Sequence, residues 1–167
     1  MGDGVGCQKP TDNPPYNPPH NLLLSMLRHV IIYADGGARG NPGPAAGAAV
    51  LFEKLENGKR GGRVGEASRY YQHATNNVAE YTGIIVGLEK AHELGYNAVE
   101  YFLDSELAVK QLNGEYRVKN AELAKLFLQI HNLKTHFRSI SFTHVRREYN
   151  KEADELVNRT IDLEMVH

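Results

Sequence analysis

The sequence predicts a single α/β domain built on a five-stranded mixed sheet with helices on its faces. Five short segments rich in apolar residues have the length of strands, and four segments have the apolar spacing of helices. Along the 167 residues they follow the order β-β-β-α-β-α-α-β-α. Because helical crossovers make the strands they join parallel, we expect strands one, four and five to be parallel and strands one to three to be antiparallel.

The strands are predicted from apolar runs bounded by turn residues. Residues 29–35, HVIIYAD, form a continuous apolar run that is typical of a strand buried on both faces. The Asn57-Gly58 pair is a strong hairpin signal, so the segments on either side of it pair with each other. The remaining predicted strands are residues 46–54, 61–74, 98–104 and 139–145.

The helices are predicted from the period of their apolar residues. In residues 75–95 the apolar positions repeat at helical spacing, and Gly95 supplies the C-terminal stop. A short helix is expected over residues 105–113, and amphipathic helices over residues 120–133 and 150–166.

The composition is that of an ordinary globular protein, with 23% charged and 41% hydrophobic residues. The net charge of −1 means that a nucleic acid would have to be bound through local charge or bound cations. A single cysteine, Cys7, excludes an internal disulfide, and no apolar run has membrane-spanning length. We therefore expect a cytoplasmic, monomeric protein, with residues 1–27 as a disordered Gly- and Pro-rich extension and residues 28–167 as the folded domain.

Four carboxylates occupy positions that the pattern would otherwise give to apolar residues. Asp35 is expected to end the first strand and Asp104 the fourth, and parallel neighbours place these ends at one edge of the sheet. Glu80 lies on the sheet-facing side of its helix, and Asp154 lies on the side of Val157 in the last helix. Clustered carboxylates repel one another, and hard oxygen ligands suit Mg²⁺ or Mn²⁺ better than zinc.

Each acid, taken singly, also has a structural explanation. Asp is favoured in turns, and capping is a common role for acidic residues at helix starts. Four acids directed to one end of one sheet favour a functional site over this alternative. The structural alternatives are a turn at Asp35, a capping box of Asn77 and Glu80, a helix cap at Asp104, and pairing of Asp154 with Arg159 or Lys151.

The motifs around these acids resemble type 1 ribonuclease H, the family of enzymes that cut the RNA strand of RNA–DNA hybrids. The similar segments are YADGGARGNPGPAAGAAV, TNNVAEYTGIIVGLE, LDSELAVKQL and NKEADELVN, which occur in the family's order between about residues 29 and 161. The resemblance implies the ribonuclease H fold and makes Asp35, Glu80, Asp104 and Asp154 the metal-binding and catalytic acids. It also implies two Mg²⁺ ions, with Mn²⁺ as an alternative, and products with 5′-phosphate and 3′-hydroxyl ends.

The resemblance further implies a set of substrate contacts. Short polar side chains can bond to 2′-hydroxyls and phosphates without reading sequence, and glycines let the backbone approach a ribose-phosphate chain closely. Capping is the structural alternative for the residues at the helix start. The implied contacts are Gly36, Gly37, Ala38, Asn41, Thr75, Asn76, Asn77 and Ser105.

Two departures from the family pattern affect substrate binding. The basic protrusion of better-known members is absent, since NGEYRVKN joins two helices directly, so we expect weak and strongly salt-dependent binding. Lys110, Arg117 and Lys119 are candidates for a partial substitute, with solvated surface residues as the structural alternative. The loop before Asp154 holds no glycine or histidine, since His144 belongs to the fifth strand; the candidates for product release or phosphate contact there are Arg146, Arg147 and Glu148.

Two other functions stay open on the same fold. One is a nuclease with a shifted substrate, either double-stranded RNA or that of a retroelement-derived domain. The other is a hybrid-binding module without catalysis. The four intact acids argue against the second, because a pure binder does not benefit from negative charge beside phosphates.

Overall fold

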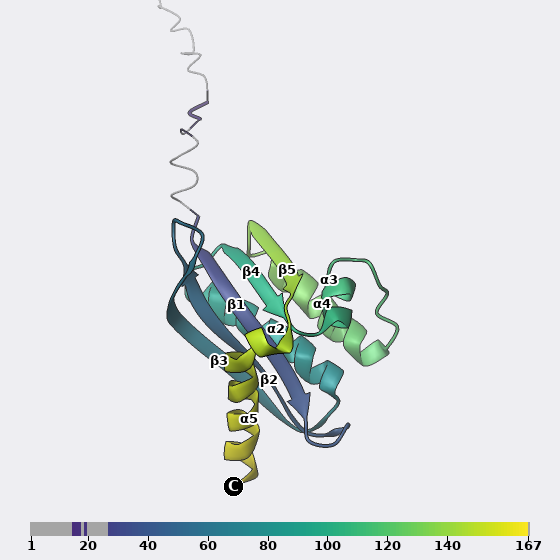
Figure 1. Ribbon diagram of the computed structural model, residues 1–167. Coiled ribbons are helices and arrows are strands. Elements are labelled where there is room, and N and C mark those ends of the chain that lie inside the picture. The colour runs from purple at the N-terminus through teal and green to yellow at the C-terminus, as the bar shows by residue number, and fades with distance from the viewer. Residues whose placement is uncertain (1–14, 18, 20–26, 167) are drawn as a thin grey trace, which may run out of the picture.

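The computed structural model describes residues 15–17, 19 and 27–166 and contains the predicted five-stranded mixed sheet (Figure 1). The strand order is β3-β2-β1-β4-β5. As predicted, β1, β2 and β3 are antiparallel, and β1, β4 and β5 are parallel. The disordered extension predicted for residues 1–27 lies almost wholly outside the described residues. The strands are β1 (His29–Ala38), β2 (Gly43–Lys54), β3 (Arg60–Ala74), β4 (Ala98–Leu103) and β5 (Ser139–His144).

The predicted helices are present with bounds shifted by one or two residues. A short 3₁₀ turn, which the sequence did not predict, precedes the last helix. None of the described helices is both long and apolar enough to span a bilayer. The helical elements are α2 (Asn76–Glu93), α3 (Glu106–Leu112), α4 (Ala121–Lys134), η1 (Arg147–Tyr149) and α5 (Lys151–Met165).

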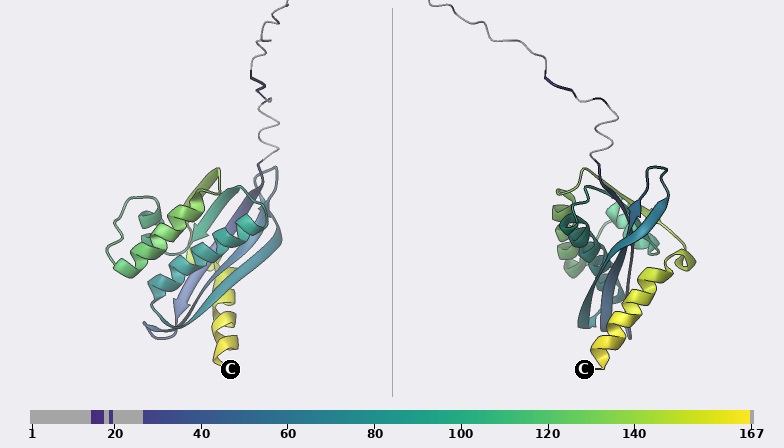
Figure 2. Two further views of the ribbon diagram at one scale, coloured as in Figure 1. Left: turned by 180° about the vertical axis from the view of Figure 1, so that it is seen from behind. Right: turned by 90° about the vertical axis from the view of Figure 1, so that its left-hand side faces the viewer.

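The helices form two unequal layers on the sheet. Among the described helices, only α5 lies on one face, whereas α2 and α4 lie on the other (Figure 2). Side chains along β1 point alternately to the two faces of the sheet. Ile32 and Ala34 belong to the larger core beneath α2. Ile31 belongs to a smaller core with Leu156 and Val157 of α5. The α2 layer is therefore the main hydrophobic core.

Glycines bring α2 unusually close to the sheet. A Cβ on Gly36 would overlap the backbone of Ala79 and Glu80, and a Cβ on Gly47 would overlap the backbone of α2 as well. The backbone of α2 makes a close approach at Gly36, and the contact with a ribose-phosphate chain expected there stays a prediction. This glycine is required by packing, and the packing places Glu80 directly above β1.

The prediction that the first strand ends at Asp35 is wrong. Strand β1 continues to Ala38 because β2 pairs with it as far as Ala38↔Ala45. Its parallel pairing with β4 stops earlier, at Ala34↔Leu103. Asp35 is thus the first residue of β1 that lacks a partner on the β4 side, and the turn that was expected there lies at residues 39–42.

Candidate active site

A cleft of about 570 Å³ opens where β4 ends and β1 continues. Asp35, Glu80, Asp104 and Asp154 all line it, and they come from four separate elements or their ends. The half-buried end of β1 and one face of α5 also line it. The fold therefore gathers the four acids that the sequence singled out.

The register of two parallel strands positions Asp35 and Asp104. Ala34 of β1 is opposite Leu103 of β4, and the residue that follows each of them in sequence is one of the two acids. Asp104 directly follows β4, at the sheet edge where β1 and β4 stop pairing. The expected convergence of these carboxylates thus follows from pairing, although only Asp104 stands at a strand end.

Helix caps near the cleft are made by hydroxyl groups and not by the acids. The Thr75 hydroxyl accepts a hydrogen bond from the Val78 amide at 3.2 Å, and the Ser105 hydroxyl accepts one from the Ala108 amide at 3.2 Å. The structural alternatives of a capping box at Glu80 and a cap at Asp104 are therefore wrong. The Ser105 hydroxyl also hydrogen-bonds the Glu80 carboxyl, which links α3 to α2 across the site.

Asn150 connects the last helix to the first strand, and the sequence analysis did not identify it. Its Nδ2 donates to the Ala34 carbonyl at 2.9 Å, and its own carbonyl accepts from the Asp154 amide at 3.1 Å. The side chain is buried, at 1% exposure, and within the described residues its Oδ1 has no hydrogen-bond partner. One residue thus touches the backbone beside Asp35 and the backbone of Asp154. Its sequence signal is its place as the first residue of the family-like segment NKEADELVN, just before the closing helix.

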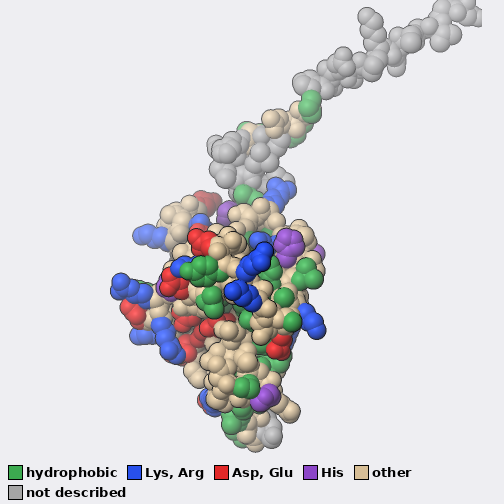
Figure 3. Space-filling model, turned by 90° about the vertical axis from the view of Figure 1, so that its right-hand side faces the viewer, with side chains coloured by type: hydrophobic (Ala, Val, Ile, Leu, Met, Phe, Trp, Pro, Cys, Tyr) green, Lys and Arg blue, Asp and Glu red, His purple; other side chains and the backbone are tan. Residues whose placement is uncertain are grey.

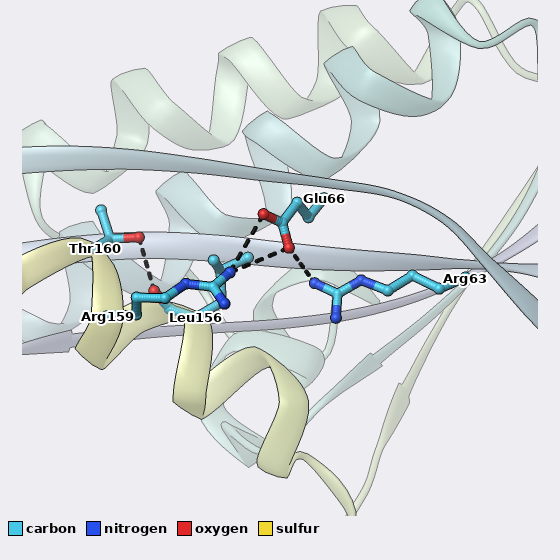
Figure 4. Close-up of polar contacts among 5 residues, drawn as sticks. All are labelled: Arg63, Glu66, Leu156, Arg159 and Thr160. Atoms are coloured by element: carbon cyan, nitrogen blue, oxygen red, sulfur yellow. Dashed lines mark hydrogen bonds and ion pairs between the residues drawn. The ribbon is translucent and has the colours of Figure 1, made fainter. Parts of the chain in front are cut away.

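Asp154 forms no ion pair with a basic side chain among the described residues. Arg159, its suggested structural partner, binds Glu66 of β3 at 3.3 Å, and Glu66 also pairs with Arg63 (Figure 4). Asp154 instead lines the cleft beside Val157, on the face of α5 that the helical pattern predicted.

Two of the carboxyl groups are strongly perturbed by their surroundings. Burial, followed by repulsion from Asp104, raises the pKa of Asp35 to about 8, although the Gly36 amide opposes this by hydrogen bonding. Burial also raises the pKa of Glu80 to about 7, again with repulsion from Asp104, while the bond from Ser105 acts the other way. Without a cation, the cleft therefore disfavours full ionisation of its acids.

The donor set fits a hard divalent cation. Four carboxylates in a polar cleft offer oxygen ligands only, and a cation there would relieve the repulsion that raises two of their pKa values. In residues 27–166, no group of three or more His, Cys, Asp or Glu side chains is close enough to form a complete metal site. Mg²⁺ does not require one, since it is usually held by one or two carboxylates with waters and substrate phosphates.

The implied substrate contacts divide into two groups. Asn76 lines the cleft with Gly36, Gly37 and Ala38, and its Oδ1 accepts from the Ala38 amide at 2.8 Å. Asn41 stands behind it, accepting from the Asn76 amide at 3.1 Å. Ser105 lines a small neighbouring pocket with Glu80 and Asp104. Asn41, Thr75, Asn77 and Ser105 do not line the cleft itself.

Basic residues at the rim also differ from expectation. Of the candidates in the loop before α5, Arg147 lines the cleft, whereas Arg146 and Glu148 lie outside it, 4.0 Å apart as an ion pair. Lys110 pairs with Glu106 of its own helix. On the face shown in Figure 3, basic side chains stand among acidic ones and do not merge into one patch. Arg39 and Asn158 also line the cleft, and the sequence analysis named neither.

Comparison with known proteins identifies the family. The reverse transcriptase-like family matches residues 33–160. A ribonuclease H of Pseudomonas savastanoi pv. phaseolicola is 31% identical over 155 residues, covering 82% of this chain and 95% of the relative. The chain belongs to the type 1 ribonuclease H family.

Other members of this family support the same assignment. The solved structure of LC11-RNase H1 in complex with an RNA/DNA hybrid is 42% identical, with a TM-score of 0.73 and coverage of 81% of this chain and 99% of that chain. The bifunctional protein Rv2228c of Mycobacterium tuberculosis is 41% identical over 133 residues, which are 80% of this chain. The chain spans only about a third, 35%, of that relative's length.

Proposed function

We propose that this domain hydrolyses the RNA strand of RNA–DNA hybrids as an endonuclease. The observation that carries the proposal is the convergence of four carboxylates from different elements in one open, polar cleft. Structural ion pairing does not explain them, since none of these four acids forms an ion pair with a base in the described residues. The hybrid bound to the LC11 relative supports this choice of substrate.

We further propose that two divalent cations, Mg²⁺ or Mn²⁺, are held by Asp35, Glu80, Asp104 and Asp154. The chemistry supplied by such a pair is activation of water and stabilisation of the leaving 3′-oxygen, which gives 5′-phosphate and 3′-hydroxyl ends. Ser105 orients Glu80 through its hydroxyl, and Asn150 fixes the backbone beside Asp35. These two residues keep the ligands in place before the substrate arrives.

The residues along the cleft can hold a nucleic-acid strand without reading its sequence. Asn76 uses its Oδ1 within the fold, and its Nδ2 has no partner in the described part of the chain, so this donor can bond a 2′-hydroxyl or a base edge. The Arg147 guanidinium at the rim can bind a phosphate. Together they would favour a strand that carries 2′-hydroxyls.

A cleavage assay with matched variants tests the proposal. Labelled hybrid, double-stranded RNA and single-stranded RNA are incubated with Mg²⁺, Mn²⁺ or EDTA. We expect metal-dependent cutting of the RNA in the hybrid alone, and a loss of about 100-fold or more in Asp35→Asn, which keeps the shape and removes the charge. Glu155→Gln, an exposed neighbour of Asp154 outside the cleft, is the control and should cut normally.

The outcomes separate the remaining alternatives. Preferential cutting of double-stranded RNA would replace the proposed substrate and keep the nuclease. Binding of the hybrid without cutting under any metal would leave a binding module only. The cytoplasmic, monomeric state stays a prediction from composition.

A further inference from the structure

Arg39 lines the cleft at the end away from the four acids. It begins the turn between β1 and β2, and its amide donates to the Pro44 carbonyl at 2.8 Å. The cleft reaches it along one face of α5, where Asp154, Val157, Asn158 and Ile161 recur at helical spacing. The cleft thus continues past the carboxylates and has an arginine at this end, whereas Arg147 of η1 lines it near the start of α5.

Helix α5 holds the Arg39 guanidinium in place. One of its terminal nitrogens lies 2.5 Å from an Asp162 carboxylate oxygen and 3.4 Å from the Asn158 carbonyl oxygen, and the other lies 3.6 Å from the Met165 sulfur. The Arg39 side chain is 39% exposed, so it is open to a ligand in the cleft. A guanidinium carries five N–H donors, more than these contacts use. It is oriented and still has donors to offer.

We propose that Arg39 binds a backbone phosphate of the substrate strand adjacent to the scissile position. A strand whose reacting phosphate sits among the four acids and which follows the cleft along α5 passes Arg39. The cation would offset the repulsion between that strand and the carboxylates, in a protein with a net charge of −1 and no basic protrusion. This inference rests on the proposed function only in requiring a nucleic-acid substrate.

A purely structural role for Arg39 makes different predictions. In that case the arginine would only tie the β1–β2 turn to α5, as Arg159 ties α5 to Glu66 of β3 (Figure 4). The two ion pairs are alike in exposure and in joining α5 to the sheet, but only Arg39 lines the cleft. Arg159→Gln is therefore the matched control for Arg39→Gln.

The salt dependence of binding distinguishes the two roles. Binding of fluorescent hybrid and of fluorescent double-stranded RNA is measured over a range of salt concentrations, with every variant made in the Asp35→Asn protein so that the hybrid stays intact. We expect Arg39→Gln to weaken hybrid binding roughly threefold to tenfold and to reduce the slope of log K against log salt by about 0.7 to 0.9, the value for one phosphate contact. Arg159→Gln should leave the slope unchanged, and Arg39→Lys should retain it because the charge remains.

Asp162→Asn supplies a second test. It removes the carboxylate that anchors Arg39 but leaves the arginine's charge, so the slope should stay at the parent value. If Arg39→Gln lowers the melting temperature and leaves the slope unchanged, Arg39 only connects the β1–β2 turn to α5, and the inference is overturned. Cutting of the hybrid by the unmodified chain would still support the proposed function. If neither the hybrid nor the double-stranded RNA binds at any salt concentration, the inference and the proposed function both fail.

Discussion

The two walls of the cleft are attached to the molecule in different ways. Asp35, Glu80 and Asp104 belong to a wall in which the backbone of α2 lies directly on β1 over the main core. Asp154 belongs to α5, which covers the opposite face with a smaller core, the buried Asn150 side chain and exposed ion pairs. We therefore expect movement of the first wall to disturb the whole fold, and movement of the second to leave the sheet intact.

The largest expected effect on stability is at Gly36, where the backbone of α2 packs against β1 without space for a side chain. Gly36→Ala would drive a Cβ into the backbone of Ala79 and Glu80, and we expect it to lower the free energy of unfolding by about 3 kcal/mol or more. Gly62→Ala is the control, since a Cβ there would meet no atom within 4 Å. Urea denaturation of both variants measures the difference, and equal stabilities would contradict the close packing of α2.

The acids of the first wall should make the metal-free protein sensitive to pH. Because burial and repulsion raise the pKa of Asp35 to about 8 and of Glu80 to about 7, the folded state holds protons that the unfolded chain releases near pH 4. The free energy of unfolding in EDTA should therefore fall as pH rises from about 5 to about 8. Asp35→Asn and added Mg²⁺ should each flatten this decline. Stability that is constant or rises over that range in EDTA would count against the repulsion.

The sequence was sufficient to predict the fold and the place where the acids gather. Apolar runs, helical periods and the Asn57-Gly58 turn report local preferences, and crossover rules convert their order into a sheet topology. The convergence of Asp35 and Asp104 follows from parallel pairing alone. These features were predictable because each depends on short-range pattern or on general topology.

Other parts of the site depend on contacts between distant segments and were therefore missed. The sequence cannot show that β2 extends β1 beyond Asp35, or that the backbone of α2 packs directly on Gly36. Asn150 and Arg39 gain their places from partners 116 and 123 positions away, Ala34 and Asp162. A single sequence carries no signal for such pairings.

Substitution of Asn150, which connects the two walls through Ala34, should reduce activity more than stability. Asn150→Ala would leave the Ala34 carbonyl without its side-chain donor but would also remove a buried oxygen that has no partner in the described residues. We expect a loss of about 1–2 kcal/mol in the free energy of unfolding. Cleavage should fall by about 10-fold or more, since the backbone beside Asp35 loses the side-chain bond that connects it to the start of α5. Melting temperature and single-turnover cleavage measure the two effects, and a loss of stability with normal cleavage would contradict the positioning role.

The smallest expected effect comes from loss of the ion pair between Arg159 of α5 and Glu66 of β3. Arg159 and Glu66 are both about half exposed, so Arg159→Gln should cost less than about 1 kcal/mol in the free energy of unfolding. The change should instead appear locally, because a helix that packs on the smaller of two cores can open without global unfolding. We expect faster amide hydrogen exchange in α5 and unchanged exchange in β1 and α2. Faster exchange in all three elements would mean that the two walls open together, and the distinction between them would be lost.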